Sequence, residues 1–192
     1  MIFKNNSKEI LGVISYLKDK NIPLQKIVIQ KVFFFLKESG FALSYSFEPY
    51  KYGPFSEELS EDLEILESEK KITIDKAMIE LKDNNAEPLN ANAKAFIDLF
   101  ADLVEDNYDF DNMEIYGTVF YCIRSLEEAL DPINKDTVLK QFTGWKGNKY
   151  LEKRVFDVFG RIINFQNKWK EQLNNKKRLN LLGNYDNTQK MN

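Results

Sequence analysis

The stretch LQKIVIQKVFFFLKES, residues 24–39, decides the fold of this chain. Its apolar residues are not confined to one stripe but cover almost the whole circumference of a helix. Pro23 precedes the stretch and Gly40 follows it, as expected at the two ends of a helix. A helix that is apolar on all sides is stable only when other elements surround it. Residues 24–39 therefore predict a buried central helix in a helical domain.

Gln30 and Lys31 form a polar pair inside this apolar helix. Burial of an amide or an ammonium group without a partner costs several kilocalories per mole. We therefore expect Gln30 to hydrogen-bond to backbone, in the extended segment that leads to Tyr52. We expect the Lys31 side chain to reach solvent or a carboxylate. Both residues are predicted to be structural rather than partner-contacting.

A turn with the sequence YKYGPFS, residues 50–56, precedes an acidic stretch. Gly53 tolerates backbone conformations that other residues avoid, and Pro54 fixes its own φ and holds its predecessor extended. Ser56 suits the N-cap of a following helix, whose positive end would favour the acids after it. The turn is thus expected to direct an acidic helix outward, through Tyr52, Gly53, Pro54, Phe55 and Ser56.

Periodicity predicts the other elements. One helix begins near Asn6, a third begins near Ser56, and residues 72–81 alternate like a small β-hairpin. Helical spacing continues in residues 96–103, 116–130, 136–142 and 151–173. The expected fold is mostly α: a winged-helix-like N-terminal half of three helices and a small β-hairpin, packed on a helical C-terminal half. We expect one domain over 1–173, with halves 1–85 and 90–173, and a flexible polar tail over 174–192.

The composition indicates a cytoplasmic protein. Of the 192 residues, 43% are hydrophobic, which is enough for a core. No apolar run reaches the roughly 18 residues needed to span a membrane, and the N-terminus has no apolar signal segment. Cys122 is the single cysteine, which fits a reducing compartment. We therefore expect no membrane partner.

The residue types also limit the chemistry. The chain contains no histidine, which excludes histidine general bases, Ser-His-Asp triads and histidine-containing zinc sites. It contains no glycine-rich phosphate loop, and Cys122 has no partner base. We therefore expect no catalytic residue, metal ligand or cofactor. The least favoured alternative is a Mg²⁺-dependent nuclease with Asp75, Glu80 and Lys82 on the hairpin.

Charge is segregated along the chain. Residues 56–69 hold seven acids and no base, whereas residues 134–192 hold thirteen bases and five acids. Such a surface suits a partner protein of opposite charge. The candidate partner-binding residues are Glu57, Glu58, Glu61, Asp62 and Glu64. Equally, the basic segment could pair with residues 56–133, either within the chain or across a homodimer.

Two motifs resemble those of a known group of proteins. Ile29-Gln30-Lys31-Val32 lies in the central helix, and Tyr52-Gly53-Pro54-Phe55-Ser56 follows about twenty residues later. This pairing resembles the YwgA-type proteins, relatives of the Panacea antitoxin-domain superfamily. The likeness covers residues 22–66, and residues 118–126 also resemble a later helix of the family. Phe55 and Ser56 stand where Panacea proteins usually have Val, so the sequence leans towards the YwgA side.

The resemblance implies a helical, winged-helix-like fold and an intracellular, non-enzymatic role. It implies an antitoxin of a toxin–antitoxin system, or an adaptor associated with phage or defence loci, that binds a toxin or another protein. We therefore expect a protein-interaction module that uses the acidic helix.

A DNA-binding winged-helix transcriptional regulator is the alternative from another class. The second helix is too apolar to leave the core, and DNA phosphates would repel the third. The basic C-terminal face is the better candidate for contact with nucleic acid. It contains Lys153, Arg154, Arg161, Lys168 and Lys170. Nucleic acid is therefore the less favoured partner.

Overall fold

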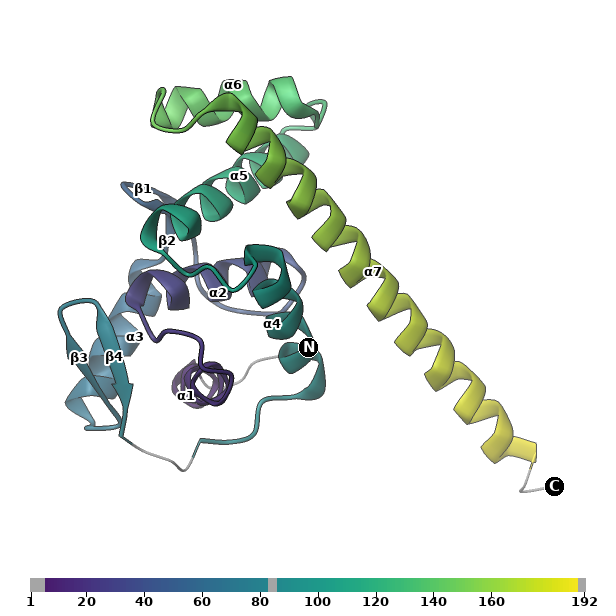
Figure 1. The fold of residues 1–192 in the computed structure, drawn as a ribbon. Coiled ribbons are helices and arrows are strands. Elements are labelled where there is room, and N and C mark those ends of the chain that lie inside the picture. The colour runs from purple at the N-terminus through teal and green to yellow at the C-terminus, as the bar shows by residue number, and fades with distance from the viewer. Residues whose placement is uncertain (1–5, 83–85, 190–192) are drawn as a thin grey trace.

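The computed structural model describes residues 6–82 and 86–189 (Figure 1). The described chain is mostly helical, as the sequence predicts, and its two hairpins lie in the N-terminal half. The helices are α1 (Asn6–Asp19), α2 (Lys26–Glu38), α3 (Glu57–Ser68), α4 (Ala91–Val104), α5 (Phe110–Glu128), α6 (Lys135–Lys146) and α7 (Glu152–Gln189). The strands are β1 (Glu48–Tyr50), β2 (Gly53–Phe55), β3 (Ile72–Asp75) and β4 (Met78–Leu81).

Two antiparallel hairpins flank α3. The hairpin of β3 and β4 pairs Ile72 with Leu81, as the alternation of residues 72–81 predicts. The hairpin of β1 and β2 was not predicted from the sequence; it pairs Pro49 with Pro54 and Tyr50 with Gly53. Its strands have three residues each, too few to show alternation, and proline in both strands argues against a strand. The predicted turn at residues 50–56 is therefore the tip and second strand of a hairpin.

Helix α2 is the central element of the core. Phe35 is fully buried, and its ring contacts Phe100 of α4, Phe120 of α5 and Phe165 of α7, with centroid separations of 5.1, 4.5 and 5.8 Å. Residues on every side of α2 are buried, including Val28, Phe33 and Leu36. Because one ring contacts three helices, α2 joins the N-terminal and C-terminal halves into one core.

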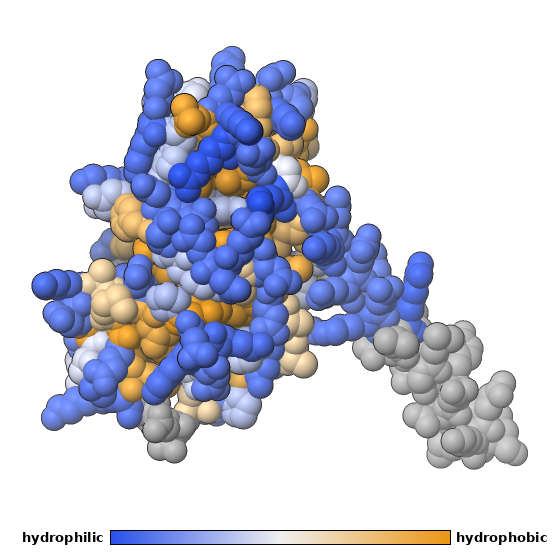
Figure 2. All heavy atoms as spheres, viewed as in Figure 1, coloured by the Kyte–Doolittle hydropathy of each residue, from blue (hydrophilic) through white to orange (hydrophobic). Residues whose placement is uncertain are grey.

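Helix α7 packs on the body with one part and leaves it with the other (Figure 1). Val155, Val158, Ile162, Phe165 and Trp169 are buried, and Leu173 is partly buried. Figure 2 shows hydrophilic side chains where α7 begins to leave the body. The helix continues to Gln189, whereas the sequence predicts a flexible tail over 174–192; residues 190–192 lie outside the described part. Elongation of a formed helix gains one hydrogen bond per residue, so helix can extend past the last packed residue.

None of the described helices combines the length and apolar character that a membrane span requires.

Removal of the Phe35 ring should damage the core strongly. We expect Phe35→Ala to lower the free energy of unfolding by roughly 3–5 kcal/mol, because it leaves a cavity among three helices. The control is Leu151→Ala, because Leu151 is 81% exposed and its change should stay within about 0.5 kcal/mol. Urea unfolding followed by circular dichroism measures both. Equal effects of the two variants would contradict the central role of α2.

Candidate functional site

Gln30 fastens the β1–β2 hairpin and the start of α3 to α2. Its Nε2 donates to the carbonyl oxygen of Ser56 at 2.9 Å, and its Oε1 accepts from the backbone N–H of Ser56, also at 2.9 Å. Gln30 thus bonds to backbone as expected, but at Ser56, the last residue of the turn, rather than in the segment that leads to Tyr52. Because both ends of the amide are used, its burial to 3% exposure carries little penalty.

Ser56 is the N-cap of α3, as predicted. Its hydroxyl oxygen accepts from the backbone N–H of Leu59 at 3.2 Å, and the hydroxyl donates to Glu58 Oε2 at 2.7 Å. This donation holds the pKa of Glu58 below its usual value. The backbone of Ser56 binds Gln30 while its side chain begins α3. The direction of α3 is therefore coupled to α2 through one residue.

The sequence predicts that the Lys31 side chain reaches solvent or a carboxylate, whereas in the structure it is buried and donates to a backbone carbonyl. It is only 3% exposed, and its Nζ donates to the carbonyl oxygen of Pro54 at 2.8 Å. Desolvation lowers its pKa to about 7; the charge of Lys146 acts in the same direction, and Glu114 opposes it. The side chain stays inside because Gly117 of α5 leaves room for it: a Cβ at Gly117 would lie 2.7 Å from Lys31 Cδ.

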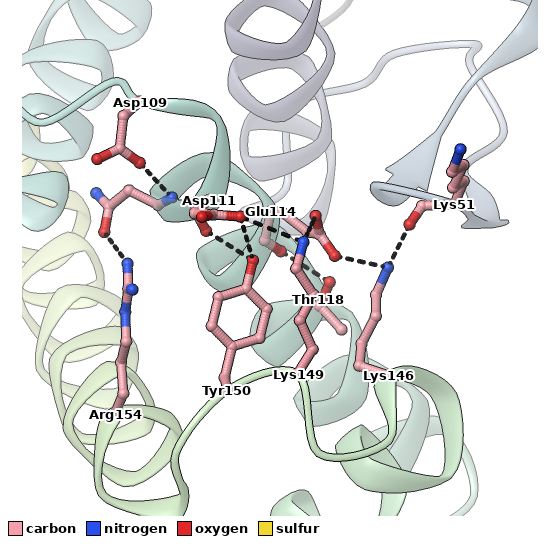
Figure 3. A network of polar contacts seen from close by, with 10 residues as sticks. Lys51, Asp109, Asp111, Glu114, Thr118, Lys146, Lys149, Tyr150 and Arg154 are labelled. Carbon is pink, nitrogen blue, oxygen red and sulfur yellow. Dashed lines mark hydrogen bonds and ion pairs between the residues drawn. The ribbon is translucent and has the colours of Figure 1, made fainter.

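Glu114 is the centre of a buried ionic network (Figure 3). Its side chain is 2% exposed; Oε1 lies 3.1 Å from Lys146 Nζ and Oε2 lies 2.8 Å from Lys149 Nζ. Lys146 also donates to the carbonyl oxygen of Lys51, in the turn between β1 and β2, at 2.7 Å. The hydrogen bond to Glu114 raises the pKa of Lys149, which therefore keeps its charge. The network ties α5 and the α6–α7 connection to the hairpin.

Glu114 is not predicted from the sequence as a site residue. Its signal is a lone carboxylate in the apolar run MEIYGTVF, residues 113–120. A carboxylate at such a position must find a cation if it is buried. The partners Lys146 and Lys149 follow more than thirty residues later. No spacing rule along the chain connects them.

A cavity of about 220 Å³ opens beside this network. We call it the aromatic pocket; its lining residues used below are Lys26, Lys31, Tyr50, Tyr52, Phe55 and Phe110. The ring of Tyr50 stacks on Phe55 at 5.2 Å, and Tyr52 meets Phe110 edge to face at 4.6 Å. Tyr50, Tyr52 and Phe110 remain 61%, 40% and 42% exposed. The motif residues Gln30, Lys31, Tyr52, Gly53 and Phe55 therefore meet at one pocket.

The acidic residues of α3 lie on its outer side. Glu57, Glu58, Glu61 and Glu64 are exposed, whereas Asp62 is half-buried and accepts a hydrogen bond from the Tyr45 hydroxyl at 2.8 Å. No salt bridge within residues 6–82 and 86–189 involves Glu57, Glu61 or Glu64. Asp62 therefore belongs more to the fold than to the exposed acidic surface.

The basic C-terminal residues are partly engaged elsewhere. Arg161 pairs with Glu105 at 2.6 Å, and Lys149 lies 3.2 Å from Asp111. Arg154 lies over the ring of Tyr150 at 5.4 Å. Lys153, Lys168 and Lys170 are exposed. The basic segment thus forms ion pairs within the chain, which is one of the alternatives that the sequence left open. Its partners lie in residues 105–114 and not in α3.

The nuclease candidates lie on an exposed hairpin. Asp75 and Glu80 are exposed, and Glu80 pairs with Lys82 at 2.6 Å. The structure shows no cluster of three or more metal-ligating residues in its described part. Cys122 is 1% exposed, and burial raises the pKa of its thiol to about 12. The thiol is therefore protonated at neutral pH.

No protein-family model matches the sequence, and a search of curated proteins finds no match. The resemblance to YwgA-type and Panacea proteins therefore stays a prediction, carried by the two motifs alone.

Gly117→Ala should disturb the site through Lys31. The new methyl group would meet Lys31 Cδ and Cε, and we expect a loss of roughly 1–3 kcal/mol in the free energy of unfolding. Gly144→Ala is the matched control, because a Cβ there meets nothing within 4 Å. Since alanine favours a helix more than glycine does, this change should raise the free energy of unfolding by about 0.5–1 kcal/mol. The cost of Gly117→Ala should shrink when Lys31→Ala is also present. An undiminished cost in the double variant would contradict this account.

The lowered pKa of Lys31 predicts a dependence of stability on pH. Between the folded pKa of about 7 and the ordinary value of 10.5, the unfolded chain binds a proton that the folded chain does not. The Lys31 contribution to stability therefore rises with pH over this range, by up to about 1.4 kcal/mol per pH unit.

Lys31→Met abolishes this contribution, so the difference in unfolding free energy between the wild-type protein and the variant should grow from pH 7 to pH 10. Urea titrations at four pH values measure it. Lys153→Met, at an exposed position, should give a constant difference. A constant difference for Lys31→Met as well would show that Lys31 is not desolvated.

Proposed function

We propose that this chain is a non-enzymatic protein-interaction module that binds a basic partner protein through the outer face of α3. The binding residues are Glu57, Glu58, Glu61 and Glu64, with Asp62 at the edge. The observation that carries the proposal is that Glu57, Glu61 and Glu64 have no cationic partner among the described residues. The cations of the C-terminal third that form ion pairs do so with Glu105, Asp111 and Glu114 instead.

The spacing of these acids supports a binding role. Glu57 and Glu61 are four residues apart, and Glu61 and Glu64 are three apart, so the three carboxylates are neighbours on one helix face. Like charges at these spacings destabilise a helix by a few tenths of a kilocalorie per mole per pair. A cationic partner would turn this repulsion into attraction, which raises the association rate and selects against acidic partners.

Helix α3 is a rigid platform for this surface. Leu59, Leu63 and Leu66 are buried on its inner side, and Ser56 caps its start. The cap is itself bound by Gln30. Because the helix is packed and capped before binding, little ordering cost would oppose association.

The resemblance of the two motifs narrows the class. We propose that the protein acts in the cytoplasm as an antitoxin, or as an adaptor associated with phage or defence loci, with a toxin or another basic protein as its partner. The second candidate function is that of a DNA-binding regulator. It is supported by the exposed Lys153, Lys168 and Lys170 of α7.

The test uses the protein encoded by the neighbouring gene. We expect the triple variant Glu57→Gln, Glu61→Gln, Glu64→Gln to bind this partner at least tenfold more weakly in calorimetry, with a smaller dependence on salt. In co-expression the same variant should no longer rescue growth. The matched control, Glu128→Gln, Asp131→Asn, Glu171→Gln, removes three exposed acids outside α3 and should bind like the wild-type protein.

Two results would contradict the proposal. One is equal binding of the α3 variant and the control. The other is binding of duplex DNA with a steep salt dependence that Lys153→Ala, Lys168→Ala, Lys170→Ala abolishes, which would establish the DNA-binding alternative.

A further inference from the structure

The aromatic pocket is an apolar hole in the surface of the molecule. The start of α2, the β1–β2 hairpin, Ala77 in the turn between β3 and β4, and Phe110 at the start of α5 enclose it, and its exposed wall is almost wholly apolar. Tyr50, Tyr52 and Phe110 remain exposed around it, and Met78, next to Ala77, is 50% exposed. Exposed apolar side chains that gather around such a hole are typical of a surface that another molecule covers.

The segments around the pocket carry bases without ion-pair partners. Lys26 lines the pocket, and Lys51 and Lys76 lie in the turns of the two hairpins that line it. We call these three residues the rim lysines; none of them forms a salt bridge within residues 6–82 and 86–189. Asp75 adjoins Lys76 in sequence, and Asp109 is engaged as the N-cap of α5. No lining residue is acidic, so the rim is net basic and suits an occupant that carries acids beside an apolar group.

Helix α3 presents acids beside an apolar group. Ile65 is 48% exposed on a helix whose outer side is rich in acids. Residues four apart are neighbours on a helix, so Ile65 continues the ridge of Glu57 and Glu61. Glu57 and Glu61 form no salt bridge with any described residue. We call Glu57, Glu61 and Ile65 the α3 ridge.

The pocket and the α3 ridge are complementary in size and charge. An apolar cavity of about 150 Å³ can hold benzene, so 220 Å³ has room for the branched side chain of Ile65. Its contact with the aromatic rings would remove apolar surface on both sides from water. Lys51 Nζ lies 5.0 Å from the ring centre of Tyr52, so its charge lies beside the wall that Ile65 would touch. Glu61, one turn before Ile65, would then face the rim lysines.

Ile65 cannot fill the pocket of its own chain. Phe55 lines the pocket, whereas Ile65 lies about 12 Å along α3 from Glu57 at the start of the helix. The buried leucines on the inner side of α3 hold the helix on the body. The ridge and the pocket can therefore meet only between two molecules.

We propose that the aromatic pocket docks α3 of a second copy of this chain, with Ile65 in the pocket and Glu57 and Glu61 towards the rim lysines. The two halves of the contact are different surfaces of one chain, so each copy offers both. One anchoring side chain and a few exposed charges make a small contact, and we expect weak, concentration-dependent association. The α3 ridge is also part of the face proposed above for a basic partner. If that proposal holds, the partner and the second copy exclude each other.

Sedimentation velocity on the full chain, from micromolar to millimolar concentration at low salt, measures the association. We expect the average mass to rise with concentration and the affinity to fall as salt is added. Ile65→Ser and Tyr52→Ala should each weaken the association at least tenfold, because each removes one side of the apolar contact. Leu151→Ser is the control: it removes an 81% exposed leucine outside both surfaces and should leave the association unchanged. Circular dichroism checks the folding of each variant.

Reversal of charge tests the pairing of the rim lysines with the α3 ridge. Lys51→Glu with Lys76→Glu makes the rim acidic, and Glu57→Lys with Glu61→Lys makes the ridge basic. Each double variant alone should stay monomeric, because its pocket and its ridge then carry charge of the same sign. An equimolar mixture should associate, because each pocket then meets a ridge of opposite charge.

Three results would overturn the proposal. The first is a single molecular mass at every concentration, which would exclude a second copy as the occupant. The second is association that folded Ile65→Ser and Tyr52→Ala leave unchanged, which would place the contact on other surfaces. The third is an equimolar mixture of the charge-reversed variants that stays monomeric. All three leave the proposal of a basic partner intact, because its readout is the partner affinity, which Tyr52→Ala, outside α3, should not change.

Discussion

Two neighbouring side chains of one apolar helix hold the hairpin that organises this molecule. Gln30 bonds to both backbone groups of Ser56, and Lys31 bonds to the carbonyl oxygen of Pro54. Through these bonds α2 sets the position of β2 and the starting direction of α3. Each polar group is buried, so loss of a partner would leave an unsatisfied donor or acceptor in the core. The aromatic pocket and the acidic face of α3 both depend on this attachment.

Burial of Lys31 has an electrostatic consequence for its surroundings. Lys146 and Lys149 pair with the buried Glu114 close to it, and the charges of Lys146 and Glu114 act on Lys31 in opposite directions. The arrangement is tolerable because Lys31 loses its charge near neutral pH and because Lys149 is 42% exposed.

The acidic and basic segments of the chain form some ion pairs with each other in the folded structure. Bases of the C-terminal third reach Glu105, Asp111 and Glu114, and they tie α7 and the α6–α7 connection to α4 and α5. The acids of α3 receive none of these partners. What remains is the acidic outer face of α3 and the exposed lysines of α7. The two helices lie on different sides of the molecule (Figure 1). The two surfaces suit partners of different chemistry.

The sequence by itself determined the helices, the β3–β4 hairpin, the central position of α2 and the cap at Ser56, because these follow from periodicity and from local hydrogen bonding. It did not show the β1–β2 hairpin, whose three-residue strands contain proline, or Glu114, whose cations lie far along the chain. It also predicted that Lys31 reaches solvent or a carboxylate, since it could not show that Gly117 makes room for that side chain inside. Only the tertiary structure decided these points, because buried charges and cavities arise between segments distant in sequence.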